Sequence, residues 1–348
     1  MAKLRAEAGK GNAVAQFKLG VLKFPDGMDV KDEAAAAVWY RKAAEQGLAE
    51  AQNNLGFMYW MGRGVAKDST EAVKWYRKAA EQGLAHAQNN LGWVYLKGGR
   101  DRRDLPDEFR GESATEDRRR QEALKLFLQA AKQGLAPAQM NVSWMHHAFV
   151  SEENLQAEDK AKTVEWCRKA AEQGDAAAQS TLSTWFSSGW MGLPRDREEA
   201  KKWLSKAAEK GDPDYQFKLG GLYYSYGERP INDAEAVKWY QLAAEQGHER
   251  AMATLGHCYG EGMGVALNRI EAYKWKLLAD SKSDQKEAEK YASWFSSDSG
   301  EKKESEKRAR EFKPKGHYYE RLTRLGDAGL ELEFTPRLAL VYEVKASK

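Results

Sequence analysis

Few residues of this chain are of types that do chemistry, and they lie far apart in the sequence. The two cysteines, Cys167 and Cys258, are too few for a disulfide framework or a four-ligand zinc site. His146 and His147 are adjacent, so on a helix their side chains would point about 100° apart and could not chelate one metal ion together. We therefore expect no metal site and no cofactor.

The motifs of common enzymes are also missing. The chain has no GxxxxGK[ST] phosphate loop, no HExxH and no GxSxG. The glycine-rich stretches at 62–64 and 260–264 follow expected helices rather than strands, so they predict turns between helices and not nucleotide loops. Most glutamates recur at regular intervals along the chain, whereas a catalytic pair should occur once. These observations favour a protein that is not an enzyme.

A repeat determines where the large side chains fall. Tryptophans and one phenylalanine recur at intervals of 36 to 52 residues, and glycines follow nearly the same step. Internal repeats of this length are typical of stacked supersecondary units. Together the two series define seven units over residues 13–281, of which 49–83 is the clearest. The aromatic series is Trp39, Trp75, Phe127, Trp166, Trp203, Trp239 and Trp275. The glycine series is Gly11, Gly47, Gly83, Gly134, Gly174, Gly211 and Gly247.

Each unit is predicted to hold two helices. In residues 49–60, Ala51, Leu55 and Tyr59 recur every four residues and would form one buried face. Gly56 lacks a Cβ atom, so a neighbouring helix could approach closely there. One such pair cannot bury its whole apolar face, so we expect the pairs to stack.

The second helix of the clearest unit has a predictable start and end. Asp68 or Ser69 offers an N-cap oxygen, and Gly83 is suited to the position just after the last turn. The six tryptophans of the aromatic series should be structural, packed between helices. Cys167 stands where other units carry a core-facing tyrosine, so we expect it to pack as a small apolar group.

The recurring pattern is A-x-A-x-x-L-G-x-x-Y, then G-x-G-V, then E-A-x-x-W-Y-x-x-A-A-x-x-G. It resembles the pattern of the Sel-1-like repeat family, a relative of the tetratricopeptide repeats, over roughly four-fifths of the chain. The resemblance implies an all-α fold in which seven helix-turn-helix units stack into a right-handed α/α superhelix. It also implies a scaffold that binds a protein or peptide in its concave groove.

The sequence departs from this pattern in several places. The third unit carries an insertion at 100–120, which we expect to be a solvated loop, partly helical or able to dock a partner. The fourth unit has HHAFVSEENLQ at 146–156 in place of the glycine turn, and the fifth and sixth units keep only a loose loop. Family members outside the cytoplasm often pair cysteines within each repeat, and this chain lacks such pairs.

The two ends of the chain differ from the repeats. Residues 1–12 read as the remnant of an N-terminal capping helix, and 282–316 as degenerate capping helices. In the tail, 317–348, the stretch 330–345 alternates like two short strands. A β-hairpin there could be part of the polar cap that a solenoid needs, or a separate binding element.

Helical phase suggests which side chains face away from the stack. If Leu55 points inward, a row of amide and aromatic side chains falls on the opposite side of the first helices, which line the concave face in tetratricopeptide-like solenoids. The asparagines could pair with the backbone of an extended peptide, and the aromatics could supply hot spots. The alternative is that the aromatics pack against the next repeat. The predicted partner-binding residues are Asn53, Asn54, Phe57, Trp60, Asn89, Asn90, Trp93, Asn141 and Trp144.

Charge and hydropathy narrow the function class. With 55 Lys and Arg against 52 Asp and Glu, the 348-residue chain is too balanced for a dedicated nucleic-acid binder. It has no apolar run of about 18–20 residues that could span a membrane, and no apolar stretch of a secretory signal at its N-terminus. We therefore expect a cytoplasmic location, or a periplasmic one if a signal peptide was removed.

These features together predict a non-catalytic scaffold or adaptor whose partner is a protein or peptide. Family resemblance allows a bacterial regulator, an envelope-assembly partner or a toxin-immunity protein. The alternative is a cell-wall hydrolase or β-lactam-binding enzyme of the same repeat family.

Overall fold

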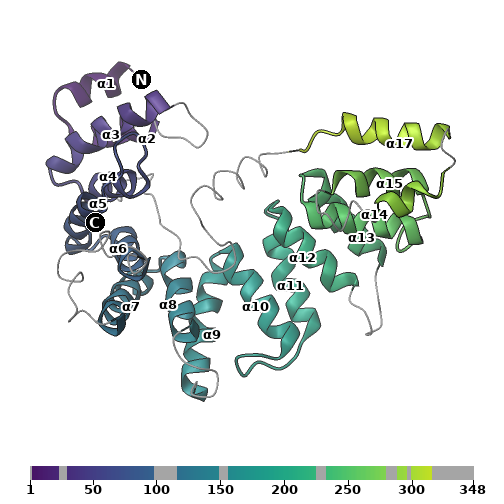
Figure 1. The fold of residues 1–348 in the computed structure, drawn as a ribbon. Helices are drawn as coiled ribbons and strands as arrows, with labels where there is room; N and C mark the ends of the chain where they lie inside the picture. Colours follow the sequence, from purple (N-terminus) through teal and green to yellow (C-terminus); the bar gives the residue numbers. More distant parts are fainter. Residues whose placement is uncertain are drawn as a thin grey trace. The chain divides into compact units, whose positions relative to one another are not determined.

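The computed structural model describes residues 2–22, 30–97, 116–148, 156–224, 233–279, 288–295 and 299–315 of the chain. Over these ranges every regular element is a helix, and the segments between them are turns and caps (Figure 1). The chain divides into two compact units, whose described parts end at Ala170 and begin at Ala171. The expected strands at 330–345 lie outside the described residues.

The first unit is a stack of helix pairs. Helix α1 packs on α2 through Ala8, Ala15 and Leu19, in the place where a capping helix was expected. From α2 on, first and second helices alternate, which is the predicted order. The helices are α1 (Ala2–Gly9), α2 (Ala13–Leu22), α3 (Val30–Glu45), α4 (Ala49–Met61), α5 (Ser69–Glu81), α6 (Ala85–Lys97), α7 (Glu116–Lys132), α8 (Ala136–Ala148) and α9 (Ala157–Glu172).

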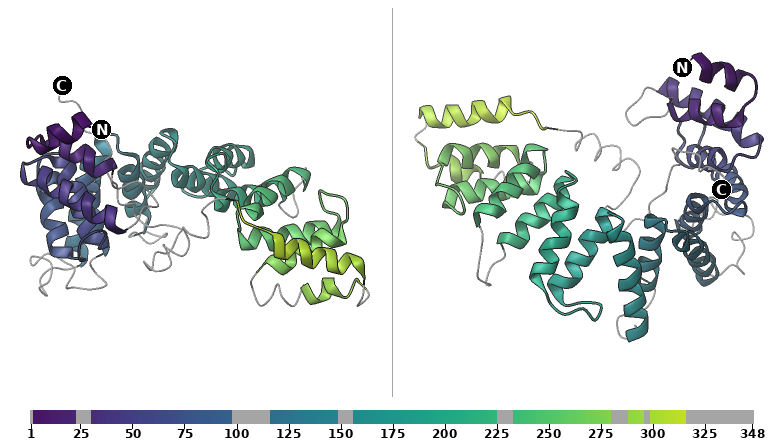
Figure 2. Two further views of the ribbon diagram at one scale, coloured as in Figure 1. Left: turned by 90° about the horizontal axis from the view of Figure 1, so that it is seen from above. Right: turned by 180° about the vertical axis from the view of Figure 1, so that it is seen from behind.

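The second unit continues the same alternation. In both views of Figure 2 its green to yellow helices lie side by side, and α17 packs on α15. A short helix at 288–292 packs on the start of α15 through Ala288 and Tyr291. The longer helices are α10 (Ala176–Ser188), α11 (Arg197–Ala208), α12 (Pro213–Tyr224), α13 (Asp233–Glu245), α14 (Glu249–Glu261), α15 (Arg269–Leu278) and α17 (Gly300–Glu311).

The two helices of a pair meet where a glycine faces an aromatic ring. A Cβ atom on Gly56 would lie 2.9 Å from Cδ1 of Tyr76, closer than real Cβ contacts, so only glycine fits. Gly92 meets Phe127 in the same way. Phe127 therefore occupies the repeat position of Tyr76, which is one residue after the tryptophan position. Its assignment to the aromatic series with the tryptophans is wrong by one residue.

The residues at the repeat positions of Gly56 and Tyr76 vary together in other units. Where the second helix carries Cys167 or Leu204 in place of the aromatic ring, the first helix carries Ser143 or Ser183 in place of glycine, and all four side chains are buried. A smaller residue on one helix leaves room for a Cβ on the other. Cys167 thus packs as a small core residue, as expected.

The glycine turns have the predicted role. Gly62 and Gly64 adopt φ of +69° and +67°, and a Cβ on Gly64 would lie 2.3 Å from the backbone oxygen of Glu33 in the preceding pair. The two described G-x-G-V turns close when the N-cap residue of the second helix donates its N–H to a carbonyl of the first helix: Asp68 to Tyr59 and Asn268 to Tyr259, both at 2.9 Å.

The fifth unit closes its turn in the same way, although the sequence suggested a loose loop. The N–H of Asp196 donates to the carbonyl of Phe186 at 2.8 Å, and the one extra residue is absorbed with Met191 at φ +55°. The expectation of a loose loop is therefore wrong for this unit. The turn of the sixth unit lies outside the described residues.

The first and last residues of the second helix α5 are those that the sequence predicted. Asp68 accepts a hydrogen bond from the N–H of Glu71 at 3.0 Å, which is the predicted N-cap, and Gly83 has φ +84° after the last turn of α5. The insertion at 100–120 was expected to be a partly helical loop, and its described residues 116–120 form the start of α7.

Candidate protein-interaction surface

The five asparagines predicted to line a groove are instead buried in the first unit. Their exposed fractions are 4% or less. Their amides are bonded to one another across three first helices: Asn141 donates to Asn89 at 2.8 Å, Asn89 to Asn90 at 3.4 Å, Asn90 to Asn53 at 2.9 Å and Asn53 to Asn54 at 3.1 Å. The prediction that these side chains face an open groove is wrong.

This asparagine ladder, Asn53, Asn54, Asn89, Asn90 and Asn141, is a structural device. A buried amide without a partner is costly, so each one is bonded to another amide, either of the adjacent residue in its own helix or of the neighbouring repeat. Because the bonds join α4, α6 and α8, the ladder ties successive first helices together.

Two of the four predicted aromatic contacts are also part of the stack. Trp60 and Trp93 are 9% and 6% exposed and meet edge to face, with ring centroids 5.5 Å apart and planes at 86°. The alternative reading, in which these rings pack against the next repeat, is therefore right for this pair. Phe57 and Trp144 are half-buried.

A second set of amides, which sequence reasoning missed, joins the repeats near their ends. Gln82 at the end of α5 donates to the side chain of Gln52 at 2.7 Å, and Gln52 donates to the carbonyl of Ala44 at 3.1 Å. The signal was present, since a glutamine recurs near the start of the first helices and another near the end of the second helices, 30 residues apart in three of the four pairs and 45 in the unit with the insertion. The same side-chain pair forms between Gln46 and Gln16, Gln133 and Gln88, and Gln246 and Gln216.

The groups that could do chemistry are held in unreactive settings. Burial, with a further contribution from the charge of Asp233, raises the pKa of the Cys258 thiol to about 11, which disfavours the nucleophilic thiolate. Burial lowers the pKa of His146, and Cys167 is buried. Within the described ranges, no three His, Cys, Asp or Glu side chains gather closely enough to hold a metal ion.

A different surface emerges at the last repeat of the second unit. Residues 312–315, the terminal segment, lie across the second helices α15 and α13. The ring of Phe312 meets Trp275 with centroids 5.4 Å apart and planes at 73°. Lys315 donates its backbone N–H to the carbonyl of Glu245 and its Nζ to the carboxylate of the same residue, both at 2.7 Å.

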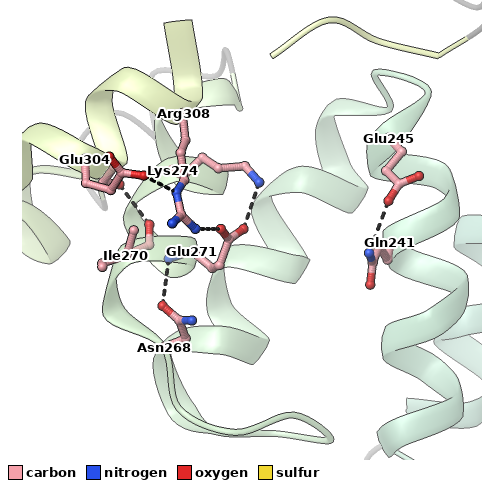
Figure 3. A network of polar contacts seen from close by, with 9 residues as sticks. Gln241, Glu245, Asn268, Ile270, Glu271, Lys274, Glu304 and Arg308 are labelled. Atoms are coloured by element: carbon pink, nitrogen blue, oxygen red, sulfur yellow. Dashed lines mark hydrogen bonds and ion pairs between the residues drawn. The ribbon is translucent and has the colours of Figure 1, made fainter. Parts of the chain in front are cut away.

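Helix α17 anchors this segment. Arg308 binds Glu271 of α15 and Glu304 of its own helix, both at 2.8 Å (Figure 3). The hydroxyl of Ser305 donates to the carbonyl of Ile270 at 2.8 Å. These contacts place the residues that follow α17 beside the second helices.

The terminal segment and the second helices α13 and α15 line an open hollow of about 350 Å³, together with Tyr259 of α14 and Glu311 of α17. Burial alone would raise the pKa of Glu245, but hydrogen bonds from Lys315 and Gln241 outweigh it and hold that pKa below its usual value. The pKa of Glu271 is likewise lowered, because bonds from Lys274 and Arg308 outweigh burial. Both carboxylates are therefore charged at neutral pH. The lining residues are Gln241, Glu245, Tyr259, Glu271, Lys274, Trp275, Glu311, Phe312, Lys313 and Lys315.

The stacked helix pairs, joined by glycine turns and buried amides, define an all-α solenoid repeat protein. None of its described helices is long and apolar enough to cross a membrane. The Sel1 repeat family matches the chain over most of its length, so the chain belongs to that family. The matched segments are 13–48, 49–84, 85–106, 109–135, 136–175, 176–212, 213–248 and 250–279. Two of them, 85–106 and 109–135, make up the single pair α6 and α7, which the insertion separates.

Several solved structures are similar to this chain, and one of them shows the same fold. A Sel1 repeat protein from Oxalobacter formigenes is 28% identical over 78% of this chain and 98% of its own, with a TM-score of 0.58. A protective antigen of uropathogenic Escherichia coli with an SLR fold is 24% identical over 93% and 97%, with a TM-score of 0.35. The immunity protein Pa5087 of Pseudomonas aeruginosa is 18% identical over 66% and 80%, with a TM-score of 0.40. No curated protein matches this chain.

Proposed function

We propose that this protein is a non-catalytic scaffold that binds a protein or peptide partner on the surface of its repeats. Sel1 repeat proteins are generally protein-interaction scaffolds. The observation that carries the proposal within this chain is the terminal segment, which the second helices hold as they would hold a bound peptide.

The contacts of that segment are those of peptide recognition. An aromatic ring is anchored on another ring, a backbone N–H pairs with a carbonyl of the host helix, and a charged side chain pairs at the rim. Aromatic anchors supply most of the binding energy in interfaces, while charges at the rim favour the correct partner. The second helices of a Sel1 repeat can therefore hold an extended chain.

The first helices have a smaller part in the proposal than the sequence suggested. The amides of the asparagine ladder are used between repeats, and Trp60 and Trp93 are buried. Phe57 and Trp144 remain candidate partner contacts, because both are half-buried. The proposal covers a regulator, an envelope-assembly partner and a toxin-immunity protein, since each acts by holding another protein.

A displayed library of random peptides tests the proposal. The full chain is immobilised and the library is selected against it, with an unrelated helical protein as the control surface. Enrichment of a consensus that binds the chain and not the control supports a peptide-binding scaffold. Failure of any sequence to enrich, together with saturable hydrolysis of peptidoglycan fragments or acylation by a labelled β-lactam, would show an enzyme instead.

A further inference from the structure

The surface that holds the terminal segment is repeated one unit earlier along the chain. Of the six residues that line the hollow from α13, α14 and α15, five have an identical residue 36 positions before them. The sixth, Gln241, corresponds to Ser205. The identical pairs are Glu245 and Glu209, Tyr259 and Tyr223, Glu271 and Glu235, Lys274 and Lys238, and Trp275 and Trp239.

One ion pair beside the tryptophan is repeated as well. Lys274 pairs with Glu271 at 2.7 Å, and Lys238 pairs with Glu235 at 2.7 Å. The residues of the earlier surface come from the end of α11, from α12 and from α13; Glu209 is exposed and Trp239 is half-buried. Both surfaces belong to the second unit.

One further feature is common to these two repeats. In four other repeats the residue three positions after the tryptophan is a lysine whose Nζ lies 4.3–4.8 Å from the centre of the tryptophan ring. In the last two repeats that residue is leucine: Leu242 after Trp239, and Leu278 after Trp275. Leu242 is 45% exposed. The ring of Trp239 thus has an exposed apolar neighbour where four other repeats place an ammonium group.

The negative charge of this earlier surface favours binding of a basic side chain. Glu209 is the C-cap of α11, where the partial negative charge of the helix end adds to that of its carboxylate. Glu245 is the last residue of α13 and binds Lys315 both through its carboxylate and through its carbonyl. A lysine that meets Glu209 would find the same two acceptors.

We infer that Glu209, Tyr223, Lys238, Trp239 and Leu242 form a docking site for an extended segment of a partner protein. That segment has an aromatic residue followed three positions later by a lysine, the spacing of Phe312 and Lys315. The aromatic ring lies on Trp239 and Leu242, and the lysine pairs with Glu209. The inference rests on the proposed function, because it names the partner that the scaffold holds.

A labelled peptide with the sequence of residues 309–316, AREFKPKG, is the probe. Its fluorescence anisotropy is measured against the full chain at low salt, since exposed charge pairs are screened. We expect saturable binding, weakened at least tenfold when alanine replaces either the phenylalanine or the second lysine of the peptide. Absence of saturable binding up to millimolar protein would overturn the inference.

Variants of the protein locate the site. Glu209→Lys and Leu242→Lys should each weaken binding of the probe at least tenfold. The second change installs the lysine that four other repeats carry, so it should be compatible with the fold. Glu81→Lys is the matched control, because Glu81 ends α5 in the same way but the next repeat has Leu126 in place of tryptophan. It should leave binding unchanged.

Two results would count against the site while leaving the scaffold function intact. If Glu245→Lys abolishes binding and Glu209→Lys does not, the probe displaces the terminal segment instead of using the earlier repeat. If the displayed library enriches a consensus without an aromatic residue and a basic residue three positions later, the chain binds peptides of another kind.

Discussion

Removal of one amide from the asparagine ladder should destabilise the protein instead of weakening partner binding. Asn89 is fully buried, donates to Asn90 and accepts from Asn141 at 2.8 Å. The change Asn89→Ala therefore breaks two hydrogen bonds, each worth about 1 kcal/mol, and takes the acceptor away from a buried donor, which costs about 1–3 kcal/mol more. We expect a total loss of about 3–5 kcal/mol.

Urea unfolding followed by circular dichroism measures this loss. Because a repeat array need not unfold in one step, hydrogen exchange of α4, α6 and α8 should be followed as well. Exchange in these three helices should rise together. The control is Lys18→Ala in α2, which changes an exposed residue at the same position of the repeat as Asn90 and should shift stability by less than about 0.5 kcal/mol. Equal stability of the Asn89→Ala protein and the parent would refute a structural role for the ladder.

Three further predictions follow from the packing and the charges. Trp93→Ala should cost about 3–5 kcal/mol of stability, as for any large aromatic lost from a core, and an unchanged melting temperature would contradict its burial. Gly56→Ala should cost about 1–3 kcal/mol in urea unfolding, because the new Cβ would crowd Tyr76, and stabilisation would contradict this. Finally, Glu271 has a lowered pKa, so its bond to Arg308 contributes stability that is present above the unfolded carboxyl pKa, about 4.3, and is lost as pH falls through the lower folded pKa. Hydrogen exchange of α17, corrected for the intrinsic rate, should therefore show less protection at pH 3 than at pH 7, and Glu271→Gln should remove part of that difference; equal protection at both pH values would refute it.

The sequence was sufficient to predict the repeat and the local structure of each unit. Helix starts and ends depend on residues close by in the chain: Asp68 caps α5 with its own carboxylate, and Gly62 and Gly83 supply left-handed backbone where an ordinary residue would be strained. The need for glycine at position 56 also followed from the pattern, because the same small residue recurred beside the same apolar face.

The terminal segment could not be found in this way. Its contacts join Phe312 to Trp275 and Lys315 to Glu245, which lie 37 and 70 residues apart in the chain, and neither Phe312 nor Lys315 belongs to a repeated unit. Once the segment was seen, the sequence did show that the lining residues recur 36 positions earlier. From the sequence, the recurring Glu, Tyr and Trp were expected to be structural, and only the structure shows one copy in contact with the terminal segment.

By itself, the sequence determined that the chain is an array of helix pairs and which side of each helix carries which residues. It could not determine whether each side of a helix contacts a neighbouring helix or the solvent. A helical wheel gives directions around one helix axis, whereas burial depends on how closely the next helix approaches. In α4, nine of 13 residues are buried, so the side turned away from its own partner helix meets the neighbouring repeats and not solvent. For that reason, asparagines that could have bound a peptide bind one another.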